Sequence, residues 1–147
     1  MSTIDSPRQN HLLAAVPVEE WERLLPRMEL RPMPLGHVLY ESGSRLRHVY
    51  FPTNSIISLL YVLEDGSSAD IAIVGNEGIV GISLFLGGET TPSRGIVQSA
   101  GHAYRVAGRY LKEEFFRAGP FQRLLLRYTQ ALITQMSQTA VCNCHHS

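Results

Sequence analysis

The chain has 147 residues with 13 basic and 13 acidic side chains, so its formal net charge is zero. A domain that binds nucleic acid by itself usually carries an excess of basic residues. This sequence therefore gives no electrostatic case for direct DNA or RNA binding. No apolar run is long enough to cross a bilayer, the polar start "MSTIDSPRQN" is not a signal peptide, and two cysteines make no disulfide framework. We therefore expect one globular domain in the cytoplasm.

The first part of the chain is expected to contain two short helices. Residues 1–9 are predicted to be a disordered lead-in, and Asn10 is placed to cap a short helix through residues 11–15. Pro17 suits the first position of a second helix. Helical structure is then expected to end at three prolines, Pro26, Pro32 and Pro34.

Residues 35–106 have the pattern of an antiparallel β structure. Turn residues separate seven short runs rich in Val, Ile, Leu and Tyr, namely "HVLYE", "RHVYFP", "SIISLLYVL", "SADIAIVG", "GIVGISLF", "RGIVQS" and "HAYRV". Many short strands with regular turns indicate a sandwich, barrel or jelly roll. The dipeptide Asp65-Gly66 predicts a tight hairpin in which both central residues have positive φ.

The last part of the chain returns to a helical pattern. Residues 109–119 predict a short amphipathic helix, and Pro120 opens a long helix that runs to about residue 143. One stripe recurs at three- and four-residue steps, at Phe121, Leu124, Leu125, Tyr128, Ala131, Leu132, Gln135, Met136 and Thr139. Either this helix only covers the β structure, or a second stripe pairs with the same helix of another subunit. Off-stripe positions favour the second interpretation, namely Leu126, Ile133 and Ala140.

Several motifs in order carry a family resemblance. They are Gly36, Leu39, Gly43, Tyr50 and Phe51 around the first strands, Asp65-Gly66 at the central hairpin, and "IVGNEGIVGISLF". Over residues 11–147 the chain resembles the cyclic-nucleotide-binding sensor domain of Crp/Fnr-type transcription regulators. The resemblance implies a mainly β fold with α, an antiparallel β-roll or jelly roll (double-stranded β-helix) with short N-terminal helices. It also implies one sensor domain over residues 10–147, with a dimerisation helix at 120–146.

The resemblance also implies a ligand site. In this family a short helical turn points backbone N–H groups at a cyclic phosphate, an arginine pairs with the phosphate, and a glutamate accepts from the ribose hydroxyl. The implied set here is Gly81, Ile82, Ser83, Leu84, Arg94, Gly95 and Ser137, with Arg94 as the phosphate arginine. Ile82 stands at the glutamate position, and losing that acceptor costs about 1–3 kcal/mol. We therefore expect cyclic AMP to bind weakly or not at all; no cofactor is expected, and another small effector stays open.

The partners implied by the resemblance are a second copy of the chain and DNA. The expected dimer interface is Phe121, Leu125, Tyr128, Leu132, Gln135, Met136 and Thr139. Family members continue into a winged helix-turn-helix that reads DNA, so DNA contact is expected only through a domain not present in this chain. The abrupt end "CNCHHS" favours a truncated sequence over a stand-alone domain. The expected function is effector sensing and dimerisation in a transcription regulator.

Two alternatives stay open, a cupin-like metal-dependent β-roll enzyme and an oligomerisation module without ligand. The sequence has no Gly-x-Ser-x-Gly, His-Glu-x-x-His or P-loop motif, and we expect no enzyme. A dense group of metal-ligand residue types lies at the C-terminus, namely Cys142, Cys144, His145 and His146. Four ligands from five helical residues leave little room for tetrahedral geometry, so no metal site is expected there.

Overall fold

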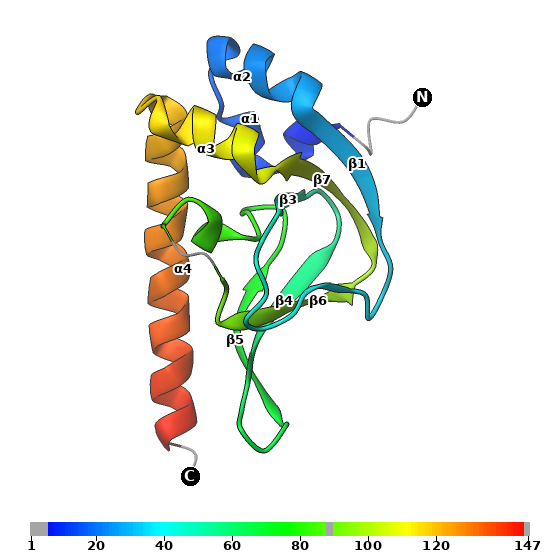
Figure 1. Cartoon of the computed structure of the whole chain (residues 1–147), viewed down its shortest axis with the longest axis vertical. Helices are drawn as coiled ribbons and strands as arrows, with labels where there is room; N and C mark the ends of the chain where they lie inside the picture. The colour runs from blue at the N-terminus through cyan, green and yellow to red at the C-terminus, as the bar shows by residue number, and fades with distance from the viewer. Residues whose placement is uncertain (1–5, 88–89, 146–147) are drawn as a thin grey trace.

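The computed structural model describes residues 6–87 and 90–145, which form two antiparallel sheets covered by helices (Figure 1). The elements are η1 Pro7–Gln9, α1 His11–Ala14, α2 Val18–Leu24, η2 Leu25–Arg27, β1 Met28–Met33, β2 Val38–Tyr40, β3 His48–Pro52, β4 Ile56–Val62, β5 Ser68–Val74, η3 Ile82–Leu84, β6 Ser93–Ser99, β7 Gly101–Ala107, α3 Gly108–Phe116 and α4 Pro120–His145. One sheet has the order β1-β7-β3 and the other β2-β6-β4-β5. The predicted fold class, an antiparallel β-roll with a long C-terminal helix, is confirmed.

Two N-terminal segments differ from their predictions. Residues 7–9 form the 3-10 turn η1 inside the segment that was expected to be disordered. Residues 28–33 form β1, where the prolines predicted only an end to helical structure. β1 pairs with β7 alone and lies at the edge of its sheet. An edge strand tolerates a proline such as Pro32 because it leaves one side of the backbone without a strand partner.

Two turns also differ from their predictions. In the β4–β5 hairpin only Gly66 has positive φ, at 89°. Asp65 instead accepts hydrogen bonds from the backbone N–H (3.0 Å) and the hydroxyl (2.6 Å) of Ser67. The run "GIVGISLF", residues 78–85, is not a strand, since Val80 makes one bridge to β3 and the chain then enters η3. The site segment is therefore a turn held against a sheet.

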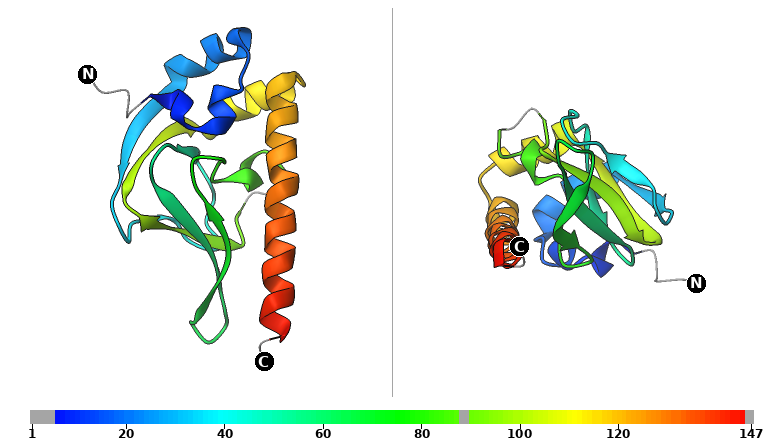
Figure 2. Two further views of the ribbon diagram at one scale, coloured as in Figure 1. Left: turned by 180° about the vertical axis from the view of Figure 1, so that it is seen from behind. Right: turned by 90° about the horizontal axis from the view of Figure 1, so that it is seen from below.

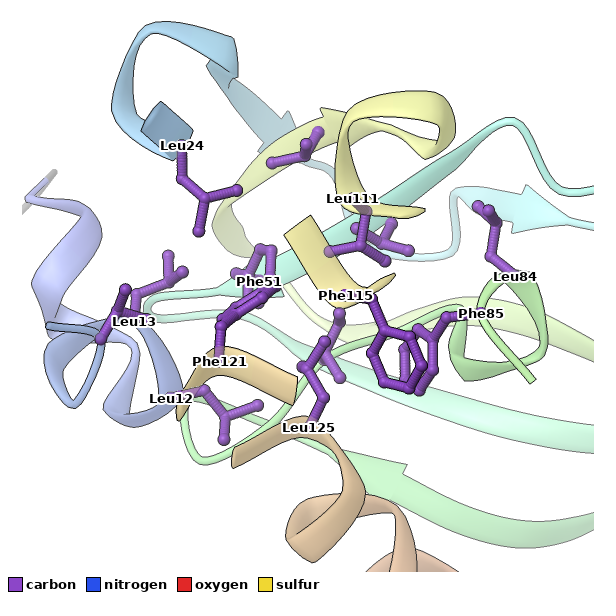
Figure 3. Close-up of a cluster of buried hydrophobic side chains, with 14 residues drawn as sticks. Leu12, Leu13, Leu24, Phe51, Leu84, Phe85, Leu111, Phe115, Phe121 and Leu125 are labelled. Carbon is purple, nitrogen blue, oxygen red and sulfur yellow. The ribbon is translucent and has the colours of Figure 1, made fainter. Parts of the chain in front are cut away.

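The core has two parts. One lies between the N-terminal helices, α3 and the start of α4, where Phe51, Phe121 and Leu125 are completely buried (Figure 3). Phe85 and Phe115 stack there with ring centroids 4.7 Å apart. The second part lies inside the β-roll and includes Ile57, Val74, Val97 and Leu132. Both parts include residues of α4, so this helix belongs to the core of the subunit.

The helix α4 runs beside the β4–β5 hairpin along the length of the roll (Figure 2). β5 is an edge strand, and its Ile73 N–H donates to the Gln135 side-chain oxygen at 2.8 Å. A helix side chain thus satisfies a backbone donor that an exposed sheet edge would leave open. Within the described residues, no helix, α4 included, combines the length and apolar character that a membrane span needs.

The N-terminus of α4 is capped from a distant helix. Both carboxylate oxygens of the buried Glu20 accept from the Phe121 N–H, at 3.0 and 3.2 Å. A carboxylate is favourable there because the first helical N–H groups carry partial positive charge. A Cβ at Gly119 would lie 2.8 Å from the carboxylate, so a glycine makes room for the cap.

We expect Glu20→Ala to lower the free energy of unfolding by about 1–2 kcal/mol, because a buried helix cap is lost. The matched control is Glu19→Ala, which truncates an exposed neighbour on the same helix and is expected to change stability by less than about 0.5 kcal/mol. Urea unfolding followed by circular dichroism measures both. Equal losses for the two variants would contradict the capping role.

Candidate functional site

A cavity of about 410 Å³ lies between the sheet β2-β6-β4-β5, the turn η3, the segment 90–93 and α4. Its lining residues are Tyr40, Leu59, Tyr61, Ile71, Ile79, Gly81, Ile82, Ser83, Leu86, Thr90, Thr91, Pro92, Ser93, Leu132 and Met136. Most of its surface is apolar, and none of these described residues carries a charged side chain. The size falls in the range of small-molecule sites, which is roughly 300–1,000 Å³.

The turn at one wall of the cavity depends on a glycine. Gly81 has φ 110°, in the left-handed region, and precedes η3. A Cβ there would lie 3.2 Å from the Val49 side chain and 3.3 Å from the His48 carbonyl oxygen. The backbone conformation and the close approach to β3 thus both favour glycine at this position. The sequence-predicted residues Gly81, Ile82 and Ser83 come together at this wall.

Leu84 and Ser137 lie away from the cavity, contrary to the resemblance-based prediction. Leu84 is buried in the helical part of the core, and a Cβ at Gly108 would lie 2.8 Å from its methyl carbons. Its position in η3 turns its side chain toward α3 rather than toward the cavity. Ser137 is exposed on α4 and is not among the lining residues.

Arg94 does not serve the cavity either. On β6 it lies between the buried Ser93 and Gly95, and it is partly exposed because successive strand residues point to opposite faces. Its Nε pairs with Glu41 Oε1 at 2.8 Å. Gly95 faces the cavity side, where an added Cβ would lie 2.7 Å from the Tyr40 ring. Gly95 therefore makes room for Tyr40 instead of contacting a ligand itself.

Three of the lining residues bring their hydroxyl groups together. Tyr40 is hydrogen-bonded to Ser93, and the Thr91 Oγ1 accepts from the Ser93 N–H at 3.3 Å. The Thr91 and Ser93 hydroxyls lie 3.4 Å apart. Burial raises the pKa of Tyr40 to about 12, although the bond to Ser93 opposes the shift. The phenol therefore stays neutral at physiological pH.

Alkaline titration tests this environment. Tyr40 and Tyr128 should ionise late, because burial raises the pKa of each above its ordinary value of 10.0. Since the pKa of Tyr40 is higher in the folded state, its stabilising contribution is complete below pH 10.0 and is lost as the pH rises toward about 12. In Tyr40→Phe, the rise of ultraviolet phenolate absorbance with pH should lack one step at high pH. A Tyr40→Phe variant that instead loses an early step would contradict burial of this hydroxyl.

The stripe predicted to form a dimer interface faces the subunit's own core. Phe121 and Leu125 are 0% exposed and Leu132 is 2% exposed, so these three cannot be interface residues while the subunit is folded. This corrects the predicted interface. Gln135 bonds to β5, and the Thr139 hydroxyl donates to the Gln135 carbonyl at 3.0 Å.

The other two predicted interface residues also face inward. The Tyr128 ring packs so closely on Gly78 that an added Cβ would overlap it, and Met136 lines the cavity. Among the described side chains of α4, the large apolar ones that remain exposed are the off-stripe pair Leu126 (44%) and Ile133 (46%), seven residues apart on one face. The side chain of the third off-stripe residue, Ala140, lies outside the described part of the chain.

Most of the cavity wall was absent from the sequence prediction. Leu59 and Tyr61 alternate on β4, and Ile71 lies on the paired β5. Strand alternation marks such residues as facing one side, but it does not tell which side encloses a cavity. In the described part of the chain no three His, Cys, Asp or Glu side chains gather to hold a metal ion. The side chains of residues 142–146 lie outside that part.

No protein-family model matches the sequence, and no curated protein matches it. Solved structures match most of the chain. The N-terminal domain of a transcriptional regulator from Streptomyces coelicolor A3(2) is 22% identical with a TM-score of 0.62, over 91% of this chain and 94% of that one. The sensor domain of the transcriptional regulator DNR from Pseudomonas aeruginosa is 12% identical with a TM-score of 0.66, over 89% and 86%.

A third match is the regulatory subunit of a cAMP-independent protein kinase A from Trypanosoma brucei. It is 16% identical with a TM-score of 0.72, over 88% of this chain and 46% of that one. These identities are low, and what the three structures share with this chain is the arrangement of the β-roll and its helices. The chain therefore has the fold that these two transcription-regulator domains and this kinase regulatory subunit share, as the resemblance implied.

Proposed function

We propose that this chain is the sensing and dimerising domain of a Crp/Fnr-like transcription regulator. Its cavity receives a small effector, and α4 passes the signal to a DNA-binding domain outside this sequence. One observation carries the proposal: α4 contributes Leu132 and Met136 to the cavity wall while it exposes Leu126 and Ile133 to solvent. A single helix thus joins a ligand site to an apolar surface suited to a second copy. The similar fold of two transcription-regulator domains supports the same function.

The effector is proposed not to be a cyclic nucleotide. Arg94 is paired with Glu41 outside the cavity, and Ile82 lines the wall where the family's glutamate would accept from ribose. A cyclic phosphate would then be buried without a partner cation, which is unfavourable because a buried charge needs pairing. The kinase subunit of similar fold is itself described as cAMP-independent, so this architecture also occurs in a protein described as independent of that nucleotide.

Light scattering tests the dimer. The native chain is expected to be a dimer, and a variant with Leu126→Asp and Ile133→Asp a monomer, because two carboxylates cannot be buried face to face. Ala131→Asp is the matched control, since Ala131 is exposed on a different side of α4. It is expected to remain a dimer. A monomeric native chain, or a double variant that stays dimeric, would remove this part of the proposal.

A reporter assay tests the regulatory function. The chain is fused through α4 to the DNA-binding domain of a characterised transcription regulator, replacing that regulator's own sensor domain. The fusion is expected to change reporter expression, and the Leu126→Asp and Ile133→Asp double variant to abolish the change. Ala131→Asp serves again as the control. Equal reporter expression from the unsubstituted fusion and from the double variant would refute the function.

A further inference from the structure

The walls of the cavity define the chemistry of what fits. Aliphatic and aromatic side chains approach from four directions, with Leu59 on β4, Ile71 on β5, Ile82 on η3 and Met136 on α4. A ligand that removes such surfaces from water gains hydrophobic stabilisation in proportion to its apolar area. Met136 is unbranched, so its side chain can adapt to an irregular ligand. These walls favour an apolar ligand with a ring or a branched chain.

The lining of the cavity includes a cluster of hydroxyl groups around Thr91 and Ser93. Both residues are buried, and their hydroxyl oxygens are 3.4 Å apart, a long contact that a ligand's hydrogen-bonding group could replace. Hydroxyl groups both donate and accept, so they suit a neutral alcohol, amide or carbonyl. They offer no counter-charge to an ionised ligand.

Three described charged side chains that lie close in sequence to lining residues make their contacts elsewhere. Arg94 pairs with Glu41, and the Glu77 carboxylate accepts from the Gly75 N–H at 3.2 Å. None of these four residues lines the cavity. An anion or cation in the cavity would therefore lose its hydration without gaining an opposite charge from the described lining residues, whereas a neutral molecule has no charge to desolvate.

We infer that the cavity binds an uncharged, mainly apolar small molecule, held by hydrogen bonds to Thr91 or Ser93. The inference rests on the proposed sensing function and names the chemical class of its effector. The volume of about 410 Å³ suits a molecule of one to three rings or an equivalent branched chain. Contact with Leu132 and Met136 would let such a molecule bias the position of α4.

A pair of probes that differ in charge tests the inference. N-phenyl-1-naphthylamine is neutral, and 8-anilino-1-naphthalenesulfonate has the same ring system with a sulfonate. Fluorescence titration of the whole chain is expected to give one neutral probe per chain, bound at least about tenfold more tightly than the anionic one. Equal affinities, or no binding of the neutral probe, would overturn the inference; the second result would fit a module whose cavity serves no ligand.

Variants show whether the probe occupies this cavity. Met136→Trp fills the cavity and is expected to weaken binding of the neutral probe by at least about tenfold. Gln138→Trp adds the same side chain at an exposed position of α4 and is expected to change affinity by less than about twofold. Unchanged binding in Met136→Trp would overturn the inference.

A second variant does not depend on filling the interior. Ser83 lies at the partly exposed turn, and Ser83→Lys should shift the preference toward the anionic probe by at least about tenfold, because it adds a cation at the rim. No shift would overturn the inference. Failure of the ligand class is distinguishable from failure of the proposed function. If the fusion changes reporter expression but the chain does not bind the neutral probe, only the ligand class is rejected. If the chain binds the neutral probe but the fusion does not change reporter expression, only the regulatory function is rejected.

Discussion

Asn10→Asp is expected to lower the free energy of unfolding by about 3–5 kcal/mol, although aspartate and asparagine are equally good helix caps on a surface. Asn10 is fully buried, and its Oδ1 accepts from the backbone N–H groups of Leu12 (3.0 Å) and Leu13 (3.2 Å). Its Nδ2 donates to the carbonyl oxygens of Pro52 and Gly78, both at 2.8 Å. One side chain thus joins α1 to the end of β3 and to the segment before η3.

The carboxylate of an aspartate would keep the cap and lose the two donors. An oxygen would then face two carbonyl oxygens in a buried site, and each unsatisfied carbonyl costs about 1–3 kcal/mol. The control is Asn76→Asp, the same chemical change at an exposed residue, with an expected effect below about 0.5 kcal/mol. Urea unfolding gives both values. A small loss in Asn10→Asp would contradict the two carbonyl bonds.

The second large effect is expected for Phe121→Ala, which should lower the free energy of unfolding by about 3–5 kcal/mol because it leaves a cavity in the core. Phe121 is 0% exposed and packs among the N-terminal helices and α3 (Figure 3). The matched control is Phe116→Ala, since Phe116 is 66% exposed. Its ring meets the Phe115 ring edge-on, with ring centroids 5.2 Å apart. This variant is expected to cost less than about 1 kcal/mol.

Denaturant unfolding at several protein concentrations separates the two roles of α4. A core residue lowers stability by the same amount at every concentration, whereas an interface residue acts through the dimer and its effect depends on concentration. Phe121→Ala is expected to follow the first pattern. A concentration-dependent loss would restore Phe121 to the dimer interface, where the sequence pattern had placed it.

The architecture was predictable because its signals are local. Six of the seven apolar runs became strands, as alternation and turn residues indicated. β1 was missed because a proline such as Pro32 usually interrupts a strand or helix, although an edge strand tolerates it. Helical periodicity separated the main stripe of α4 from the off-stripe residues, and the exposure of Leu126 fits that separation. The family resemblance placed Leu125 and Leu132 at the dimer interface, whereas both face inward.

The site was predictable only where backbone geometry decides it. The family resemblance pointed to Gly81, and the structure gives the physical reason, since a left-handed turn against β3 favours glycine. Arg94 was misplaced because a family pattern gives a position in sequence, whereas the face of a strand depends on register, and Arg94 points away from the cavity. The hydroxyl cluster of Tyr40 and Ser93 depends on β2 meeting β6, which no local pattern encodes.

We propose that the described lining of the cavity carries no charged side chain and that the chain therefore does not bind cyclic nucleotides. Titration calorimetry of the native chain with cyclic AMP and cyclic GMP tests it most directly. We predict no saturable binding of either nucleotide, with dissociation constants weaker than about 1 mM. Sub-micromolar binding of either one, at one site per chain, would contradict the claim.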